Sequence, residues 1–378
     1  MSLSRIHFKT WIELDASALA ANVKTIRRLL GRRTRLWFVV KSNAYGHGLV
    51  HMSALAQENG VDGFCVDSVI EGGRLREAGI VKPILALGPT LPHLFAPAAE
   101  RGILLTIAGR EYLDALGRSP AKPEFHLKID SGMHRQGFSF EEIPDIAGRI
   151  RRHGLAPRLK GAYTHFAAAK DPTYQAYTGI QFEKFNAAAA ALKKSGVWGK
   201  GALLHCAASG ATYLDRRTHL DLVRVGIGIY GLWPSRELEL RIGGALAFKP
   251  VLSWRSIISE IKTVEKGAFI GYDMSERLAK KSRLAIVPIG YWHGFDRGLS
   301  GKGDVLVNGR RARIRGRVSM DLIIVDVTGI PCRVGHTVTL IGRDGGEEIK
   351  AGELAARIDT TAYEVLTRIN PLIKKLVV

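Results

Sequence analysis

The sequence has few cysteines and no long apolar run. Its cysteines are Cys65, Cys206 and Cys332, and no two of them form a C-x-x-C pair. This small, odd number excludes a full disulfide framework and favours a reducing compartment, so we expect a cytoplasmic protein. No apolar stretch approaches the roughly 18 residues that suggest a transmembrane helix. Residues 1–15 lack the apolar segment of a signal peptide. We therefore expect no membrane association.

Acidic residues are also few relative to basic ones. The chain has 55 Lys and Arg against 35 Asp and Glu, a formal net charge of +20, which is a feature of many nucleic-acid-binding proteins. However, there is no zinc-finger spacing, no aromatic RNA-binding signature and no basic tail. The densest basic group, residues 310–317 (RRARIRGR), largely alternates, as one solvated strand face would. We therefore predict no nucleic-acid partner, and an anionic small substrate or cofactor explains part of the charge.

The first 230 residues contain short apolar strands that alternate with helical stretches. The predicted strands are 36–40, 63–66, 83–87, 104–107, 124–129, 159–164, 202–206 and 222–227. The helical stretches are 19–30, 51–59, 68–78, 110–116, 141–152 and 178–195. This alternation predicts a parallel α/β sheet, and eight units in roughly 200 residues predict a (β/α)8 TIM-type barrel. An open doubly wound sheet is the alternative, but no G-x-G-x-x-G turn opens a first crossover helix.

The pattern changes near residue 249. Short strands are predicted at 251–261, 283–288, 305–307, 312–314, 322–327 and 337–341, with one helix near 351–358 and a separate strand at 7–15. We predict two domains, a barrel over 14–248 and a mainly β domain over 249–378.

Polar residues stand where the barrel strands end, and in a (β/α)8 barrel that is where the chemistry takes place. They are Lys41 and Tyr45, Lys128 and Arg135, His165, Cys206 and Ser209, and Arg224 and Gly226. Singly, each has a simpler interpretation, such as a surface charge, a core histidine or a structural ion pair. Together, five polar strand ends at one face indicate a polar site.

Lys41 ends a buried strand, and a desolvated lysine amine can form a Schiff base. Ser209, Gly226 and Ile227 follow the last two strands, where barrels often bind phosphate through N–H groups and a hydroxyl. A lysine at one strand end and a phosphate site across the mouth predict pyridoxal phosphate as the cofactor. No metal site is predicted.

Residues 39–48 (VVKSNAYGHG) resemble the cofactor-lysine motif of the alanine racemase family. Further blocks that resemble the family follow in the same order, at 127–133, 163–166, 205–207, 223–227, 288–291, 316–321 and 363–365. The resemblance covers nearly the whole chain. It implies a barrel and a C-terminal β domain to which the strand within 1–13 returns. It also implies interconversion of L- and D-alanine with pyridoxal phosphate, supplying D-alanine for peptidoglycan, in a homodimer whose β domains complete the partner's sites.

The resemblance also implies roles for single residues. Lys41 and Tyr272 would be the two acid/base groups, with Tyr272 delivered from the other chain. Arg224 would face the pyridine nitrogen. The other implied cofactor-binding residues are Tyr45, His165, Ser209, Gly226, Ile227 and Tyr363. Arg135 and Met320 would bind the substrate carboxylate, and Lys128 is a candidate carbamylated lysine that would orient Arg135.

Several positions differ from the family pattern: Ala208 stands where Asn is usual, Asp273 where Gly is usual, and Lys170 where Asp is common, while Ser319 replaces a common Cys and Trp292-His293 replace Ala-Asp. Because of these departures, a racemase of broader specificity, or for serine, is one alternative. A non-catalytic binder of pyridoxal phosphate is another, although the chain retains the second domain and Tyr272. A fold-related decarboxylase is a third.

Overall fold

The computed structural model describes residues 8–378, which fold into two compact units. The barrel unit comprises residues 17–44 and 49–249. The β unit comprises the N-terminal segment through Ala16, residues 45–48 and residues 250–378. His7 and the rest of residues 1–7 lie outside the described residues, so the predicted strand at 7–15 is described only from its second residue.

Within residues 8–378, the barrel unit contains an eight-stranded parallel sheet, and this confirms the predicted (β/α)8 fold. The strands are β2 (Arg35–Val39), β3 (Gly63–Val66), β4 (Ile84–Ala86), β5 (Ile103–Ile107), β6 (Phe125–Lys128), β7 (Leu159–Tyr163), β8 (Leu203–His205) and β9 (Leu222–Val225). Each end lies within two residues of its prediction. A bridge between Ala208, just after β8, and Arg224 on β9 brings these two strands side by side and nearly closes the barrel. Parallel strands in such a barrel are buried on both faces, which is why they read as continuous apolar runs.

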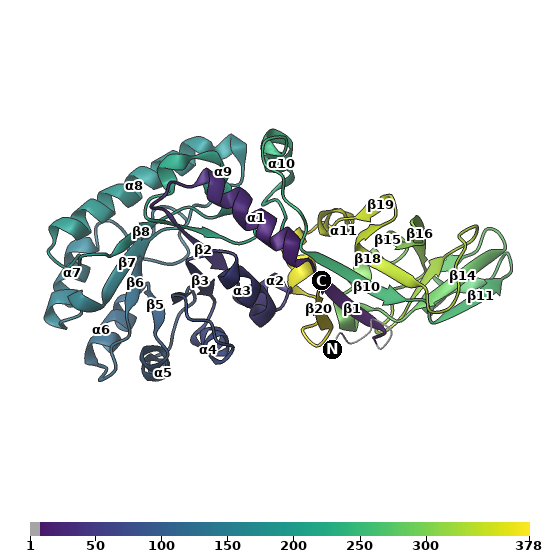
Figure 1. Ribbon diagram of the computed structural model, residues 1–378, viewed down its shortest axis with the longest axis horizontal. Helices are drawn as coiled ribbons and strands as arrows, with labels where there is room; N and C mark the ends of the chain where they lie inside the picture. The colour runs from purple at the N-terminus through teal and green to yellow at the C-terminus, as the bar shows by residue number, and fades with distance from the viewer. Residues whose placement is uncertain (1–7) are drawn as a thin grey trace. The chain divides into compact units, whose positions relative to one another are not determined.

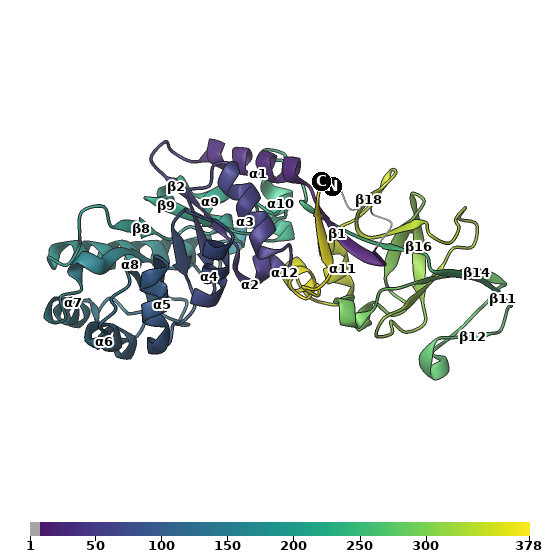
Figure 2. The same cartoon turned by 60° about the horizontal axis from the view of Figure 1, so that its bottom comes forward.

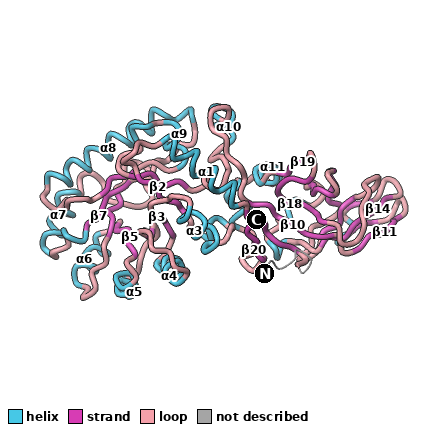
Figure 3. The backbone as a smooth tube through the Cα atoms, viewed as in Figure 1, coloured by secondary structure: helices cyan, strands magenta, loops and turns pink. Residues whose placement is uncertain are grey.

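Helices surround these strands, as Figures 1 and 3 show. They are α1 (Ala16–Leu29), α2 (Lys41–Tyr45), α3 (Leu49–Glu58), α4 (Val69–Glu77), α5 (Phe95–Glu100), α6 (Arg110–Arg118), α7 (Ile143–Arg152), α8 (Gln175–Lys194), α9 (Ser209–Leu214) and α10 (Arg236–Ile242). Four 3-10 turns accompany them: η2 (Pro92–Leu94), η3 (Ala156–Arg158), η4 (Pro172–Tyr174) and η5 (Arg216–Thr218). The sequence did not predict α5, α9 and α10, because elements of six or seven residues are too short to show helical periodicity.

The β unit is built on a long mixed sheet of order β11-β14-β17-β16-β15-β18-β10-β1-β20, with β19 beside β18. Its strands are β1 (Thr10–Leu14), β10 (Leu252–Ile257), β11 (Glu260–Val264), β14 (Ser282–Val287), β15 (Asp304–Val307), β16 (Arg310–Arg315), β17 (Ile323–Asp326), β18 (Thr337–Asp344), β19 (Glu347–Ile349) and β20 (Lys374–Val377). The hairpin of β12 (Phe269–Ile270) and β13 (Glu276–Arg277) pairs separately. The turns η6 (Tyr272–Met274), η7 (Tyr291–His293) and η8 (Arg297–Leu299) and the helices α11 (Ala351–Arg357) and α12 (Ala362–Thr367) complete the unit.

The strand predicted over 251–261 is two strands, β10 and β11, and this prediction was wrong in detail. The chain changes partners at Ile258 and Ser259. The N–H of Ile258 donates to the carbonyl of His336, whereas the N–H of Ser259 donates to that of Ile286. The alternation of apolar and polar residues continues across Ile258 and Ser259, so the sequence pattern does not show that one strand ends there and another begins.

The arginine-rich segment 310–317 forms β16 and its end, with Ala312 and Ile314 buried. Its arginines are paired within the β unit. Arg311 contacts Glu353 and Glu347, Arg313 contacts Asp304, and Arg315 contacts Glu276 and Asp326. The alternation predicted for a solvated face is present, and these cations stabilise the unit itself. No helix within residues 8–378 is both long and apolar enough to cross a membrane.

Candidate active site

The site begins with an unusual turn that follows β2. Ser42, Asn43 and Ala44 have φ/ψ angles near 55°/52°, 55°/43° and 53°/52°, and Tyr45 has φ 48°. This is a left-handed helical turn made without glycine, which costs roughly 1–2 kcal/mol per residue. Such a conformation persists only where surrounding contacts fix it, and it marks functional sites more often than chance. The turn comes directly after Lys41.

The Lys41 side chain lies near the carboxylate of Asp67 at the end of β3. The Nζ atom is 4.0 Å from Asp67 Oδ1, and the two side chains are 38% and 57% exposed. An ion pair between side chains this exposed to solvent contributes little to stability. The amine is therefore accessible for chemistry.

Lys128, at the end of β6, is a buried amine among cations. Burial, followed by the charges of Arg224 and Arg135, holds its pKa well below the ordinary value, with Asp130 opposing. The Nζ atom lies 4.3 Å from the centroid of the Tyr163 ring and has no hydrogen-bond acceptor in the described chain. Burial and the neighbouring guanidinium groups therefore favour the neutral, nucleophilic form of this amine.

His165 follows β7 and is also held neutral. Burial lowers its pKa well below the ordinary value, and the charges of Lys128, Arg224, Arg135 and Lys41 act in the same direction. All four basic side chains act electrostatically on the His165 imidazole, so the predicted strand-end residues lie around a common region of the barrel unit.

The loop after β6 presents Arg135. The Asp130 Oδ1 atom accepts the N–H groups of Gly132, Met133 and His134 at 2.9, 3.0 and 3.1 Å. Burial works to raise the pKa of Asp130, but these three hydrogen bonds outweigh it and the pKa is lowered. Arg135 is exposed and has no hydrogen-bond or ion-pair partner among residues 8–378. Its guanidinium is available for an anion.

Arg224 on β9 is buried, at 3% exposure, and lacks a carboxylate partner within the described residues. Its Nη1 donates to His205 Nδ1, and its Nη2 donates to the carbonyls of Thr164 and Cys206. A guanidinium has five N–H groups, so these three bonds leave two donors. The His205 ring stacks on Tyr163 at 4.7 Å and bonds to His126.

Ser209 and Gly226 meet at the ends of β8 and β9. The N–H of Gly226 donates to Ser209 Oγ at 3.2 Å, and Ile227 beside it is buried. Ala208, where the family usually has Asn, is the residue before α9 and makes no side-chain capping bond. One hydroxyl and the neighbouring N–H groups therefore remain as phosphate donors.

Four predicted residues belong to the β unit. The ring of Tyr45 packs edge-on against that of Tyr363, with centroids 5.7 Å apart. Tyr272 is 66% exposed in η6, and Met320 is 54% exposed. Asp273, after Tyr272, has φ 61° and lies 4.0 Å from Arg317 Nε. The left-handed φ explains why glycine is usual here, and Arg317 offsets the added charge.

The residues of the barrel unit fit pyridoxal phosphate on the chemistry of their donors. Lys41 supplies an accessible primary amine for an aldehyde. The remaining basic residues, Lys128, Arg135 and Arg224, lie in a region with few anions, and Ser209 and Gly226 supply neutral polar groups. No group of three metal-ligating side chains occurs among the described residues.

Comparisons with known proteins decide the family. The family model described as "Alanine racemase, N-terminal domain" matches residues 14–234. The model described as "Alanine racemase, C-terminal domain" matches residues 251–377. The chain belongs to the alanine racemase family. It is 37% identical to an alanine racemase of Leptospira interrogans, over 98% of this chain and 96% of that one. It is 36% identical to alanine racemase 1 of Bacillus subtilis, over 100% and 95% of the two chains.

Solved structures agree. The alanine racemase of Bacillus anthracis with bound L-Ala-P superposes with a TM-score of 0.90 at 35% identity, covering 98% of this chain and 95% of that one. Alanine racemases are isomerases that use pyridoxal phosphate.

Sequence reasoning missed the residues that surround the predicted ones, namely Asp67, Glu71, His126, Tyr163 and His205. One signal was available: His126 and Lys128 are two apart on one strand, so both face the same way. The partners that they meet come from distant strands, and no local pattern reveals them.

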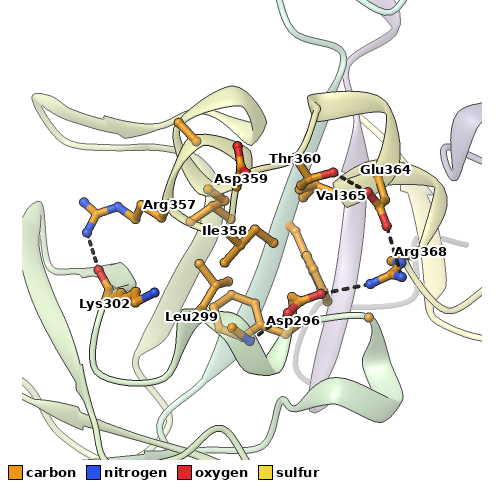
Figure 4. Close-up of a pocket in the computed structure, with 16 residues that line it drawn as sticks. Asp296, Leu299, Lys302, Arg357, Ile358, Asp359, Thr360, Glu364, Val365 and Arg368 are labelled. Atoms are coloured by element: carbon orange, nitrogen blue, oxygen red, sulfur yellow. Dashed lines mark hydrogen bonds and ion pairs between the residues drawn. The ribbon is translucent and has the colours of Figure 1, made fainter.

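A separate cavity of about 480 Å³ lies in the β unit, lined by Trp254, Phe295, Leu299, Ile358 and neighbouring residues (Figure 4). None of the predicted site residues lines it. Arg368 in its wall pairs with Asp296 and Glu364 at 2.9 and 3.0 Å. The charges of the wall largely compensate one another, so we assign the cavity no role in the reaction.

Proposed function

We propose that this protein interconverts L- and D-alanine, with Lys41 and Tyr272 as opposing acid/base groups. Family membership supports the reaction class. The structural observation that carries the proposal is Arg224, a buried guanidinium bonded to neutral acceptors with two N–H groups left over.

Bound pyridoxal phosphate would supply an electron sink that acidifies the Cα–H bond of the amino acid. Arg224 would bind the ring nitrogen through a remaining N–H. Because a guanidinium cannot give up its proton in a protein, it donates without transferring. An aminotransferase would favour a carboxylate at this place, so Arg224 favours proton return over transamination.

Two bases on opposite faces allow a proton to leave one face of Cα and another to arrive on the other face, without reorientation of the substrate. The Lys41 amine would serve one face and the Tyr272 phenol the other. Arg135, exposed and without a partner in the described part of the chain, would hold the substrate carboxylate, with the N–H of Met320. Lys128 would orient Arg135 after carbamylation.

Six further residues would hold the cofactor: Tyr45, His165, Ser209, Gly226, Ile227 and Tyr363. Tyr363 is partly buried, which raises the pKa of its phenol, so its hydroxyl stays protonated and can donate to phosphate. His165, held neutral, can accept a proton from one neighbour and donate its own to another.

We propose a homodimer in which residues 14–248 form the cofactor-binding barrel, and residues 249–378 with strand 1–13 complete the partner's site. The support is an exposed apolar group in the β unit: Phe269, Tyr272, Met274, Tyr291, Trp292, Met320 and Leu322. Trp292 N–H donates to the Met320 carbonyl, which joins two of these loops. Figure 2 shows β12 and the turn after it projecting below β11 and β14. Exposed aromatic and apolar side chains are enriched at protein interfaces.

We also propose that the protein acts in the cytoplasm, supplying D-alanine for peptidoglycan. The free state of Cys65, Cys206 and Cys332 in the described structure fits a reducing compartment.

The test uses the holoenzyme with and without borohydride. Reduction should fix the cofactor on Lys41, as peptide mapping would show, and the unreduced enzyme should interconvert the alanine enantiomers. A reduced adduct on another residue would overturn the assignment of Lys41. Faster racemisation of serine or a basic amino acid than of alanine would show that alanine is not the preferred substrate. Release of carbon dioxide from a diamino acid would indicate a decarboxylase.

A further inference from the structure

We propose that Glu71 is a positioning residue for Lys41, because its carboxylate fixes the left-handed turn that follows the lysine. The inference rests on the proposed function only in that Lys41 is the cofactor lysine. The contacts themselves are independent of any reaction.

Glu71 lies in the first turn of α4 and bonds to two strand ends at once. Its Oε1 accepts the N–H of Asn43, in the turn after β2, at 3.1 Å. Its Oε2 accepts the N–H of Asp67, at the end of β3, at 2.9 Å. One carboxylate therefore ties together the ends of the two strands that carry Lys41 and Asp67.

The start of α4 places this carboxylate. Ser68 is the N-cap, and its Oγ accepts the N–H of Glu71 at 3.2 Å. In an ordinary capping box the glutamate reaches back to the N–H of the cap residue. Here it reaches one residue further, to Asp67, and its other oxygen is then free to bind Asn43.

The turn needs this support. Ser42, Asn43, Ala44 and Tyr45 are all left-handed, which is unfavourable for residues with side chains. Two further bonds of the turn are local, Ala44 N–H to the Val40 carbonyl at 2.8 Å and Leu49 N–H to Asn43 Oδ1 at 3.0 Å. The bond to Glu71 alone, among these, connects the turn to a neighbouring strand.

The consequence concerns the Lys41 amine. With the turn fixed, the direction in which β2 delivers Lys41 is fixed as well. Loss of the Glu71 bond to Asn43 frees the turn toward ordinary backbone conformations, and Lys41 turns with it. The expected defect is slow and incomplete reaction of Lys41 with the cofactor aldehyde.

The test compares Glu71→Gln with Glu77→Gln, on the same helix. Glutamine keeps the size of the side chain but has one acceptor oxygen, so its NH2 faces an N–H donor. Glu77 contacts the exposed Arg101 and neither strand end. Asp67→Asn is a second control, because it removes the carboxylate nearest Lys41 and leaves the Asp67 N–H in place.

Two measurements follow. Hydrogen exchange by mass spectrometry, on enzyme freed of cofactor, should show about tenfold faster exchange at residues 42–45 in Glu71→Gln, as expected for one lost hydrogen bond. Trapping of added pyridoxal phosphate on Lys41 by borohydride should slow roughly 10- to 100-fold, as for other displaced reacting groups. Both controls should match the wild type in hydrogen exchange.

Unchanged exchange at residues 42–45 in Glu71→Gln would overturn the proposal, and so would an equal increase throughout the barrel. Should Glu71→Gln fail to fold, Glu71→Asp takes its place. The aspartate side chain is one methylene shorter, so its carboxylate can keep the bond to the Asp67 N–H but not the bond to the Asn43 N–H. The same local increase in hydrogen exchange at residues 42–45 is therefore expected. If the wild type traps no cofactor on Lys41, the proposed function fails, while the exchange result still decides the role of Glu71.

Discussion

His126 Nδ1 and His205 Nε2 are 2.8 Å apart in the interior of the barrel. Arg224 has donors alone, so it forces His205 Nδ1 to accept. His205 must then carry its proton on Nε2 and donate to His126 Nδ1. His126 in turn carries its proton on Nε2, a buried atom without a partner in the described chain. One arginine thus sets the tautomers of two histidines in series.

His205→Leu breaks this series and leaves an N–H of Arg224 buried without an acceptor. A loss of roughly 1–3 kcal/mol in the free energy of unfolding is expected, as for other buried donors left unpaired. Urea denaturation of the cofactor-free protein would measure it. His134→Asn, at a mostly exposed histidine, is the control and should stay within about 0.5 kcal/mol. Equal losses in both variants would argue against the series.

The pH dependence of stability should reflect the same histidines. Burial, with the charge of Arg224, lowers the pKa of His126 to about 3, and those of His165 and His205 are also lowered. The unfolded chain binds these protons near pH 6.5, whereas the folded chain does not. As the pH falls below about 6.5, each of these histidines should therefore lower the free energy of unfolding by about 1.4 kcal/mol per pH unit. Above that pH they should have no effect on it.

Denaturation between pH 4.5 and pH 8 in wild type and His126→Asn would test this. The difference between the two in unfolding free energy should change with pH below about 6.5 and stay level above it. A constant difference across the whole range would mean that the pKa of His126 is the same in the folded and the unfolded chain, which contradicts the prediction.

Tyr272→Phe should retain the absorbance of bound cofactor and lose racemisation by roughly 10²- to 10⁴-fold, the usual contribution of one general acid/base group. Exchange of the alanine Cα proton in deuterated water, followed by NMR from each enantiomer, would separate the two faces. Tyr112→Phe, on α6, is the matched control. Full activity in Tyr272→Phe would remove this phenol from the mechanism.

Lys128 should react with carbon dioxide, because burial and the charges of Arg224 and Arg135 lower the pKa of its amine and favour the neutral form. The amine would add to carbon dioxide, release a proton and form an anionic carbamate that Arg135 can bind. Carbon-13 NMR in labelled bicarbonate should show one carbamate signal that Lys128→Met abolishes. Lys160→Met, at a partly exposed lysine paired with Glu124, should keep it. A signal that survives in Lys128→Met belongs to another amine.

Asp273 should influence which amino acids are accepted, since its carboxylate adjoins Tyr272. Asp273→Gly removes a left-handed residue with a side chain, which costs roughly 1–2 kcal/mol, and restores the usual glycine. We expect a lower ratio of lysine to alanine racemisation and equal or greater thermal stability. An unchanged ratio of lysine to alanine racemisation would show that the Asp273 carboxylate faces away from the substrate.

The sequence predicted those parts of the molecule that depend on local pattern. The barrel strands carry continuous apolar runs, and Lys41, Lys128 and Arg224 each stand at or near a strand end, so their convergence followed from the fold. The bond from Glu71 to Asn43 could not be predicted. The Ser68-x-x-Glu71 spacing indicates a cap, but the second oxygen meets a turn 28 residues away in the chain. Left-handed geometry at Ser42 to Tyr45 was equally hidden, because none of these residues is glycine.

Strand β1 lies between β10 and β20 in the β unit, pairing Thr10 with Ser256 and Trp11 with Lys374. During synthesis, β1 leaves the ribosome well before β10 and β20, its partners in the sheet. At about 5–20 residues per second, the residues between Thr10 and Ser256 take roughly 12 to 50 s to make. Throughout that time the apolar side chains of β1 lack their sheet, while the whole barrel sequence emerges behind them. The sheet of the β unit can therefore form around β1 only after β20 has been made, and until then β1 is an apolar segment that a chaperone can bind.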